Sequence, residues 1–305
     1  MKNKRILTCA ITGGIHTPTL SEYLPVTKDQ IAQSAIEAAE AGASVVHIHA
    51  RNDHDGSPSA KLEDFGYIID KIKSHNENIL ICVTTGGALG MTIDERTAVL
   101  PTFNPEIATM NAGSINWGLF PLADKFTEWK YEWEKEYFEK TRHAVFQNSF
   151  GDMEIYLKKM RESGSLPELE CYDVGHLYNV KFMKDAGWLP EGKVYLQFVH
   201  GINGALGTDP ADLITMKQTA DRLFGTSGYV WSAFGAGRFE YPIATQAMLM
   251  GGNFRVGLED NLYLSKGVKA RSNAELVTKM VNIMDQFDIK PATYDEAREM
   301  LGIKK

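Results

Sequence analysis

Residues 27–50 read TKDQIAQSAIEAAEAGASVVHIHA, and they contain the unit from which we predict the fold. Thr27 and Gln30 have the spacing of a capping box, in which two side chains satisfy backbone N–H groups at a helix start. A helical pattern follows and ends at Gly42, a residue typical of helix ends. Residues 44–50 then form a β-branched apolar run that predicts a strand. One helix followed by one strand is the repeating unit of a parallel sheet.

Short apolar strands and helical patterns alternate through the rest of the chain in the same way. We expect eight strands, at residues 5–12, 44–50, 78–85, 106–112, 166–172, 194–199, 228–234 and 254–260. Strict alternation predicts a parallel sheet, and eight repeats favour closure into a (β/α)8 TIM barrel over an open sheet. Barrels of about 250 residues form one domain. We therefore predict one (β/α)8 barrel domain over residues 1–305.

The regular spacing breaks once, between the fourth and fifth strands, where residues 117–165 intervene and residues 117–141 are dense in aromatic side chains. We predict an aromatic-rich helical insertion after strand four, as an extra helix or lid that could also form a subunit contact. An elongated barrel helix with an ordinary buried face would fit the same residues. The last segment, TYDEAREMLGIKK (293–305), predicts a C-terminal helical extension.

Composition argues against several classes of protein. The chain has 305 residues, 44% of them hydrophobic, and a net charge of −7, whereas a nucleic-acid partner would favour a basic face. No apolar run approaches the roughly 20 residues of a membrane helix. The cysteines, Cys9, Cys82 and Cys171, are few and far apart, which suits a reducing cytoplasm. The start MKNKRILTCAITGG imitates a signal peptide, but we read it as the first strand. We expect a cytoplasmic protein that binds neither membrane nor nucleic acid.

Two histidines end the second predicted strand. His47 and His49 share one face because residues two apart in a strand point to the same side. Active sites of TIM barrels lie at the C-terminal ends of the strands. Two imidazoles on one face suit zinc, although a catalytic zinc site needs a third protein ligand and an open position. The alternative is a pair of hydrogen-bonded histidines at the barrel rim.

The eighth strand offers candidates for the third ligand. Alternate strands fill the same layers of a barrel, so strands two and eight contribute together. The eighth strand ends in Glu259 and Asp260, although carboxylates at a strand end are often caps or rim charges. Arg255 lies on the same face as Glu259, about 13 Å lower along an extended strand. An inward arginine needs an anion, which is either the substrate or a structural ion pair.

Polar side chains also mark the ends of the third, fourth and fifth strands. The turn TTGG (84–87) offers hydroxyl groups and a backbone that a ligand can approach, although an ordinary turn has the same composition. The polar side chains that share a face are Thr109 and Asn111 on strand four, and Glu168, Glu170 and Tyr172 on strand five. An inward glutamate is an acid/base candidate or orients another group. Convergence of polar groups from these strand ends favours an enzyme over a scaffold protein.

Several segments, in order along the chain, resemble the beta-keto acid cleavage enzymes. They include AITGGIHTPT, EAGASVVHIHAR, PEIATMNAGSINWG, QFVHGINGALG and GGNFRVGLEDNLYLSKGV. H-x-H on strand two and GLEDN on strand eight are the most specific parts. The resemblance implies a zinc-dependent TIM-barrel acyltransferase that condenses a beta-keto acid with acetyl-CoA to give acetoacetate and an acyl-CoA. It also implies a homo-oligomer, with a tetramer favoured.

The resemblance carries roles onto residues of the barrel mouth. It implies His47, His49 and Glu259 as the zinc ligands. The catalytic residues that it implies are Asp260, Arg255 and Glu170. We expect Asp260 to transfer the proton and Arg255 to tune it.

The resemblance also implies a substrate-binding wall. Thr84, Gly87 and Thr109 match substrate-contacting positions, and Asn111 shares the face of Thr109. Thr84 stands where the aminohexanoate-cleaving relative has a serine, so a hydroxyl group is retained with an added methyl group. The backbone of Gly87 and these polar side chains would orient the substrate.

One departure from the relative concerns the substrate's tail. Ile15 stands where the aminohexanoate-cleaving relative has a glutamate that can meet an ammonium group. An apolar side chain cannot pair with a cation, so we expect a substrate without an amino group beside Ile15. His16 follows and could meet an anionic tail, although a loop histidine is more often simply exposed.

A different reaction on the same fold is the runner-up. A zinc-dependent hydrolase or aldolase would use a similar metal site and act without CoA. Amidohydrolase barrels place H-x-H on strand one with further histidines on later strands. Strand one has no such pair in this chain, which favours the acyltransferase.

Overall fold

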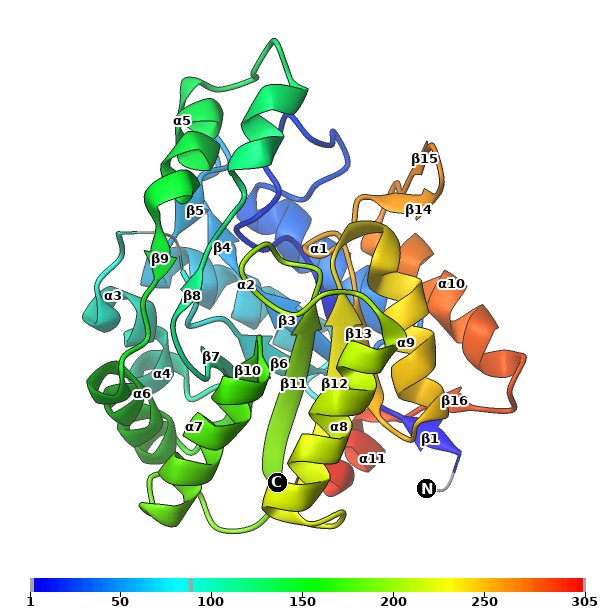
Figure 1. The fold of residues 1–305 in the computed structure, drawn as a ribbon. Helices are drawn as coiled ribbons and strands as arrows, with labels where there is room; N and C mark the ends of the chain where they lie inside the picture. The colour runs from blue at the N-terminus through cyan, green and yellow to red at the C-terminus, as the bar shows by residue number, and fades with distance from the viewer. Residues whose placement is uncertain (1–2, 88–89, 304–305) are drawn as a thin grey trace.

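A closed barrel of eight parallel strands forms the centre of the molecule (Figure 1). The computed structural model describes residues 3–87 and 90–303, so the outermost residues of the predicted domain 1–305 lie outside the described part. Around the barrel the strands follow the order β10, β11, β12, β13, β2, β3, β6, β7. Their bounds are β2 Leu7–Ala10, β3 Val45–Ile48, β6 Leu80–Val83, β7 Ile107–Asn111, β10 Leu166–Cys171, β11 Val194–His200, β12 Tyr229–Gly235 and β13 Asn253–Val256. Each lies within or overlaps a predicted strand, and the (β/α)8 barrel is confirmed.

Helices alternate with these strands and pack on the outside of the barrel. They are α1 Lys28–Glu40, α2 Leu62–His75, α3 Ile93–Thr97, α4 Val99–Phe103, α6 Phe150–Ser163, α7 Val174–Asp185, α8 Pro210–Phe224, α9 Glu240–Leu249 and α10 Asn273–Asp285. The predicted capping box of α1 is present, because Thr27 and Gln30 each bond the other's backbone. The largest apolar core lies between strands and helices and includes Ile31, Ile48, Phe198 and Phe254.

The N-terminal end of the barrel is closed by the predicted C-terminal extension. Helix α11, Tyr294–Leu301, packs Ala297 and Leu301 against a layer of inward side chains. That layer contains Ile6, Val45, Leu80, Ile107 and Tyr195. Burying this end in apolar contacts leaves the opposite, C-terminal mouth as the accessible end of the barrel.

The insertion between β7 and β10 forms an additional helical segment above that mouth. Its elements are β8 Ile115–Asn116, η1 Phe120–Lys125, α5 Glu132–Lys140, η2 Thr141–His143 and β9 Val145–Phe146. In Figure 1, α5 stands apart from the ring of barrel helices. Ser149 starts α6 as a separate helix by accepting a hydrogen bond from the N–H of Asp152. The predicted helical insertion is therefore confirmed as an extra element. The alternative prediction, a single elongated barrel helix, is wrong.

Short strand pairs complete the fold outside the barrel. They are β1 Lys4–Arg5 with β16 Lys290–Pro291, β4 Ala50–Arg51 with β5 Pro58–Ser59, and β14 Tyr263–Ser265 with β15 Val268–Lys269, and a short helix η3 spans Gly237–Phe239. The first predicted strand, 5–12, was thus too long, because Arg5 pairs with β16 and the barrel strand β2 spans only Leu7–Ala10.

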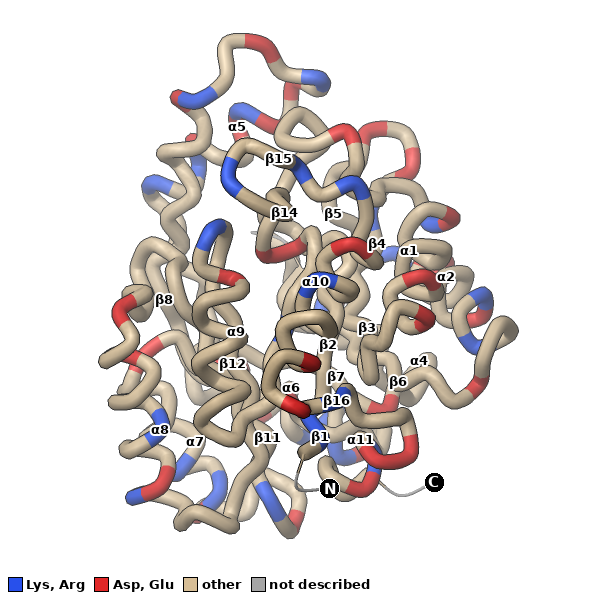
Figure 2. Tube along the Cα trace, turned by 90° about the vertical axis from the view of Figure 1, so that its right-hand side faces the viewer, with Lys and Arg blue, Asp and Glu red and all other residues tan. Residues whose placement is uncertain are grey.

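The outer surface mixes charges of both signs. Figure 2 shows acidic and basic residues interspersed over the helices on the side that faces the viewer. The longest described helix, α8, has 15 residues. None of the described helices combines the length and apolar character needed to cross a membrane.

Candidate active site

The eighth strand ends earlier than its sequence suggests. β13 stops at Val256, and Gly257 then turns the chain with a φ of 147°. A side chain there would place its Cβ 2.1 Å from the carbonyl oxygen of Ala10, so only glycine fits. The fully buried Glu240 of α9 holds the turn, because its carboxylate accepts hydrogen bonds from Gly257 N at 2.7 Å and Asn261 Nδ2 at 3.0 Å. GLEDN is therefore a turn that folds across the barrel mouth.

This turn brings Arg255 into direct contact with the acids that follow it. The guanidinium donates to Asp260 at 2.8 and 2.7 Å and to Glu259 at 2.9 Å, and it lies 3.5 Å from Glu170. The predicted separation of about 13 Å along a strand was wrong because the chain does not stay extended after Val256. Burial disfavours the charge of Arg255, but Asp260 and Glu259 outweigh burial and hold its pKa well above the usual value. Arg255 is thus an anchor for carboxylates inside the barrel.

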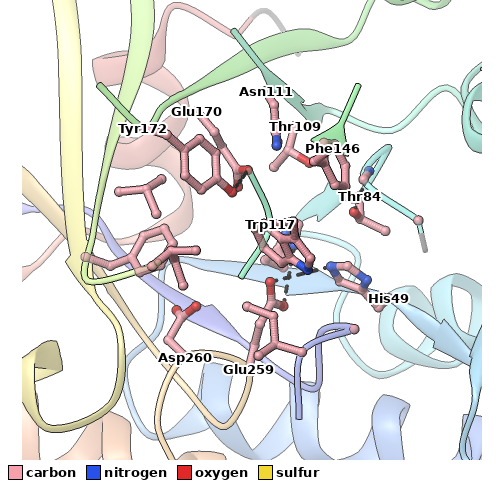
Figure 3. A pocket seen from close by; sticks show the side chains of 18 of the residues that line it. His49, Thr84, Thr109, Asn111, Trp117, Phe146, Glu170, Tyr172, Glu259 and Asp260 are labelled. Carbon is pink, nitrogen blue, oxygen red and sulfur yellow. Dashed lines mark hydrogen bonds and ion pairs between the residues drawn. The ribbon is translucent and has the colours of Figure 1, made fainter. Parts of the chain in front are cut away.

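His47, His49 and Glu259 face one another at the mouth. His47 Nε2 lies 3.6 Å from Glu259 Oε2, and His49 Nε2 lies 3.5 Å from Glu259 Oε1 (Figure 3). Gly13 makes room for the glutamate, since a Cβ there would lie 2.3 Å from Glu259 Cγ. Among the described atoms, Glu259 Oε2 is buried without a hydrogen-bond partner, whereas Oε1 accepts from Arg255, so Oε2 is free to bind a metal ion.

Protonation in this group suits a metal ion. Burial lowers the pKa of His47 to about 3, so the imidazole is neutral. Burial raises the pKa of Glu259, but the adjacent Arg255 guanidinium outweighs burial and holds it well below the usual range. Two imidazole nitrogens and one carboxylate are the donor set of a zinc site with an open position. These three side chains could therefore hold a divalent metal ion.

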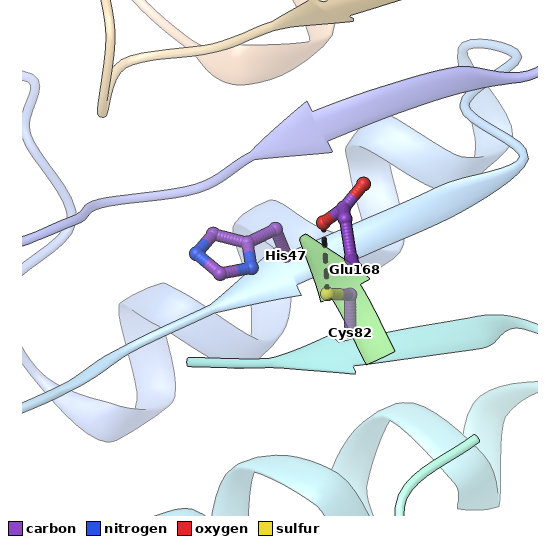
Figure 4. A group of neighbouring side chains, drawn as sticks. All are labelled: His47, Cys82 and Glu168. Carbon is purple, nitrogen blue, oxygen red and sulfur yellow. Dashed lines mark hydrogen bonds between the residues drawn. The ribbon is translucent and has the colours of Figure 1, made fainter. Parts of the chain in front are cut away.

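A second group of possible ligands lies deeper in the barrel, where His47 neighbours Cys82 and Glu168 (Figure 4). Cys82 Sγ donates to Glu168 Oε2 at 3.4 Å, and Glu168 Oε1 accepts from Gln197 Nε2 at 3.0 Å. Burial raises the pKa of the Cys82 thiol well above its usual value. Because a metal binds the thiolate form, this group is the weaker metal candidate.

Carboxyl groups with perturbed proton affinity lie beside the metal-ligand candidates. Burial raises the pKa of Glu170 to about 7 and that of Asp260 to about 6, with Arg255 opposing the shift in both cases. Tyr172 donates its hydroxyl proton to Glu170 Oε2 at 3.1 Å. Acid groups that titrate near neutrality in a pocket are candidates for proton transfer.

The predicted substrate-binding residues line another wall of the pocket. Figure 3 shows Thr84, Thr109 and Asn111 around the cavity that contains Glu259 and Asp260, and Gly87 also lines it. Thr84 Oγ1 accepts a hydrogen bond from Gly86 N at 2.9 Å. The hydroxyl proton of Thr84 is thus free to point to a ligand oxygen.

Every site residue predicted from the sequence lines this same pocket, including Ile15. Sequence reasoning missed much of the apolar lining. Those residues are Trp117, Tyr137 and Phe146 of the insertion, and Val199, Ile202 and Phe234. Their aromatic and aliphatic side chains look like ordinary core residues, so no chemical signal marks them. The density of aromatics in the insertion was the one available sign.

Comparisons with known proteins identify the family. The model of a family described as beta-keto acid cleavage enzyme matches residues 4–303. A 3,5-dioxohexanoate:acetyl-CoA acetone transferase of Paraburkholderia graminis is 44% identical over 303 residues, which cover 99% of this chain and 97% of the relative. A 3-keto-5-aminohexanoate cleavage enzyme of Fusobacterium nucleatum is 34% identical over 307 residues, which cover 100% of both chains.

A solved structure shares the fold. It is described as the ternary complex of ObcA with a C4-CoA adduct and oxalate, and it superposes with a TM-score of 0.73 at 18% identity. The match covers 92% of this chain and 68% of the other. The barrel, the polar groups gathered at its mouth and a family match over nearly the whole length lead to one conclusion: the chain belongs to the beta-keto acid cleavage enzyme family.

Proposed function

We propose that this protein is a zinc-dependent acyltransferase that condenses a beta-keto acid with acetyl-CoA and releases acetoacetate and an acyl-CoA. One observation carries the proposal: the His47, His49 and Glu259 side chains converge beside the Arg255–Asp260 ion pair in one pocket. The name of the Paraburkholderia relative, an acetyl-CoA acetone transferase, supports the use of acetyl-CoA.

His47, His49 and Glu259 would hold the zinc ion. The buried Glu259 Oε2, which has no hydrogen-bond partner among the described residues, and the neutral His47 fit this role. The chemistry that zinc supplies at such a site is Lewis-acid polarisation of substrate oxygens, which acidifies the carbon between ketone and carboxylate. A catalytic zinc site has three protein ligands and an open position for these oxygens.

Asp260 would take the proton from that carbon. Its carboxylate is fixed by two hydrogen bonds from Arg255, so its orientation in the pocket is set before the substrate arrives. Thr84, Thr109 and the backbone of Gly87 would hold the substrate's carboxylate from the facing wall, with Asn111 beside them. Glu170 would serve as a further acid/base group.

The carbon chemistry follows from this placement. The deprotonated carbon attacks the thioester carbonyl of acetyl-CoA, a C–C bond forms, and the CoA thiolate leaves. The thiolate then attacks the original ketone carbon, and the bond between that carbon and the carbon that was deprotonated breaks. The enolate released takes back the proton that Asp260 removed. Acetoacetate and the CoA ester of the remaining acyl part result, with no external oxidant or reductant.

An isotope experiment tests the proposal. With acetyl-CoA labelled in its acetyl group, the label is expected in the methyl ketone end of acetoacetate, and the acyl-CoA product should be unlabelled. Product formed from a keto acid without acetyl-CoA would instead favour the runner-up, a hydrolase or aldolase. Metal analysis of the purified protein should find zinc. The expected homo-oligomer, with a tetramer favoured, stays a prediction that light scattering can check.

A further inference from the structure

The pocket has charged groups on one side only. Its charged side chains and ligand candidates come from the ends of β3, β10 and β13 and the turn after β13. Another wall belongs to a second apolar cluster above the barrel. That wall comprises Ile15, Trp117, Tyr137, Phe146 and Ile202. A substrate held at the charged side therefore extends its far end toward apolar side chains.

The tyrosine hydroxyl of this wall already has a partner within the protein, and the tryptophan ring is packed against other rings. Tyr137 donates its hydroxyl proton to the carbonyl oxygen of Gly14 at 2.8 Å. Trp117 packs against Phe146 and Tyr172 with ring centroids 5.6 and 6.4 Å apart. Among the described lining residues, this apolar wall contributes no charged side chain. A charged substrate tail would find no counter-ion there.

His16 does not supply the missing charge. Its Nδ1–H donates to the carbonyl oxygen of Leu258 at 2.7 Å, and His16 is not among the residues that line the pocket. Burial lowers its pKa to about 4, so the ring is neutral at physiological pH. The possibility raised by the sequence, an anionic tail against His16, is therefore not supported by the contacts.

The apolar wall is also held in place. The buried Glu134 of α5 accepts hydrogen bonds from Thr19 N at 2.9 Å and Thr19 Oγ1 at 3.0 Å. Trp133 Nε1 donates to the carbonyl oxygen of Asp55 at 3.2 Å. The Tyr137–Gly14 and Glu134–Thr19 bonds fasten the insertion to the loop that carries Ile15, and the Trp133 bond ties it to the loop between β4 and β5. A pre-formed wall of this kind selects by fit and does not rearrange around a charge.

We infer that the natural substrates are beta-keto acids whose tail beyond the ketone is uncharged and mainly apolar. The inference rests on the proposed function and names its substrate class. Moving an ammonium or carboxylate from water to a site without a counter-ion costs several kcal/mol. A charged tail should therefore lower affinity by about 100-fold or more relative to an uncharged tail of equal length.

Three 3-oxo acids of matched chain length test the inference: 3-oxohexanoate, 3-keto-5-aminohexanoate and 3-oxohexanedioate. Their binding to the zinc-supplemented protein is measured by calorimetry without acetyl-CoA, and kcat/KM is measured with it. 3-Oxohexanoate, whose tail is uncharged, should bind about 100-fold more tightly than either of the two acids with a charged tail. The inference is overturned if an acid with a charged tail binds as tightly as 3-oxohexanoate or more tightly, or if 3-oxohexanoate does not bind.

Substitution of Ile15 sharpens the same test. Ile15→Glu should weaken the binding of 3-oxohexanoate and strengthen the binding of 3-keto-5-aminohexanoate, because a carboxylate then faces the substrate tail. The matched control Ile15→Val keeps an apolar side chain and should keep the order of the wild type, and circular dichroism confirms that both variants fold. An unchanged order in Ile15→Glu contradicts the place given to Ile15.

The two proposals fail in different ways. A correct binding order without any acetyl-CoA-dependent acetoacetate overturns the proposed reaction and leaves the substrate class standing. Acetyl-CoA-dependent turnover that prefers a charged keto acid overturns the substrate class and leaves the reaction standing.

Discussion

Arg255 and Asp260 form a two-point ion pair at the barrel mouth, with Nε 2.8 Å from Oδ2 and Nη2 2.7 Å from Oδ1. The two residues lie on either side of the Gly257 turn, so the pair exists only because the chain leaves the strand there. A fork-to-fork pair fixes the carboxylate in orientation as well as position. Asp260 can therefore present the same oxygen to each substrate.

Removal of the Asp260 charge should slow the reaction strongly and leave the bound zinc in place. We expect Asp260→Asn to lower kcat by about 100-fold or more, the usual contribution of a general acid or base. Zinc content should stay at the wild-type value, because Asp260 is not one of the proposed ligands. Steady-state assays with acetyl-CoA and metal analysis check both points. Near-normal turnover in zinc-loaded Asp260→Asn would show that another group moves the proton.

The two candidate metal groups can be separated by substitution. His47→Ala combined with His49→Ala removes two of the three proposed ligands, so bound zinc should be lost. Cys82→Ala is the matched control, since Cys82 belongs only to the deeper group with His47 and Glu168. It should retain zinc. Atomic emission measures the zinc content of each dialysed variant. Zinc retained by the double histidine variant would refute the site formed by His47, His49 and Glu259.

The attachment of the insertion should depend on one buried carboxylate. Glu134→Gln places an amide NH2 against donors from Thr19 and Tyr131, so we expect a loss of about 1–3 kcal/mol. Hydrogen exchange should rise in residues 12–27 and 120–143. Glu136→Gln is the control on the same helix, because Glu136 forms only an exposed ion pair with Lys140 and should cost at most about 0.5 kcal/mol. Equal losses of stability in Glu134→Gln and Glu136→Gln would argue against Glu134 as the attachment of the insertion.

Stability should fall as pH rises because of Glu240. Burial raises the pKa of Glu240 to about 8, with Asp260 adding to the shift and Asn261, Gly257 and Lys279 opposing it. The folded state then binds more protons than the unfolded state between the ordinary value near 4.5 and 8. The stabilising contribution is complete at low pH and is lost as pH rises through about 8.

Urea unfolding between about pH 5 and 9 measures this effect. The free energy of unfolding should decline more steeply with pH in the wild type than in Glu240→Gln, which cannot ionise. Glu170, whose pKa is also raised by burial, adds a slope of the same sign that is common to both proteins. Parallel curves for the two proteins would contradict the prediction.

Local sequence signals determined the barrel and part of its mouth. Apolar runs alternating with capped helices gave all eight barrel strands, because strand and helix periodicity are properties of neighbouring residues. The same period of two placed His47 and His49 on one face, and their rings lie 5.1 Å apart. The resemblance to a known family then added roles for Thr84, Gly87 and Thr109, which lie around the same pocket.

Contacts between distant residues decided the rest. Periodicity extended the eighth strand through Asp260, but Glu240 of α9 holds a turn there and brings Arg255 to the carboxylates. Cys82 approaches His47 only because β3 and β6 pair in the barrel. The apolar wall combines Ile15 with insertion residues about a hundred positions later. Sequence thus determined which helices and strands form. Tertiary packing determined which charges are buried together and which side chains surround the substrate. The reason is that desolvation and ion pairing depend on neighbours in space.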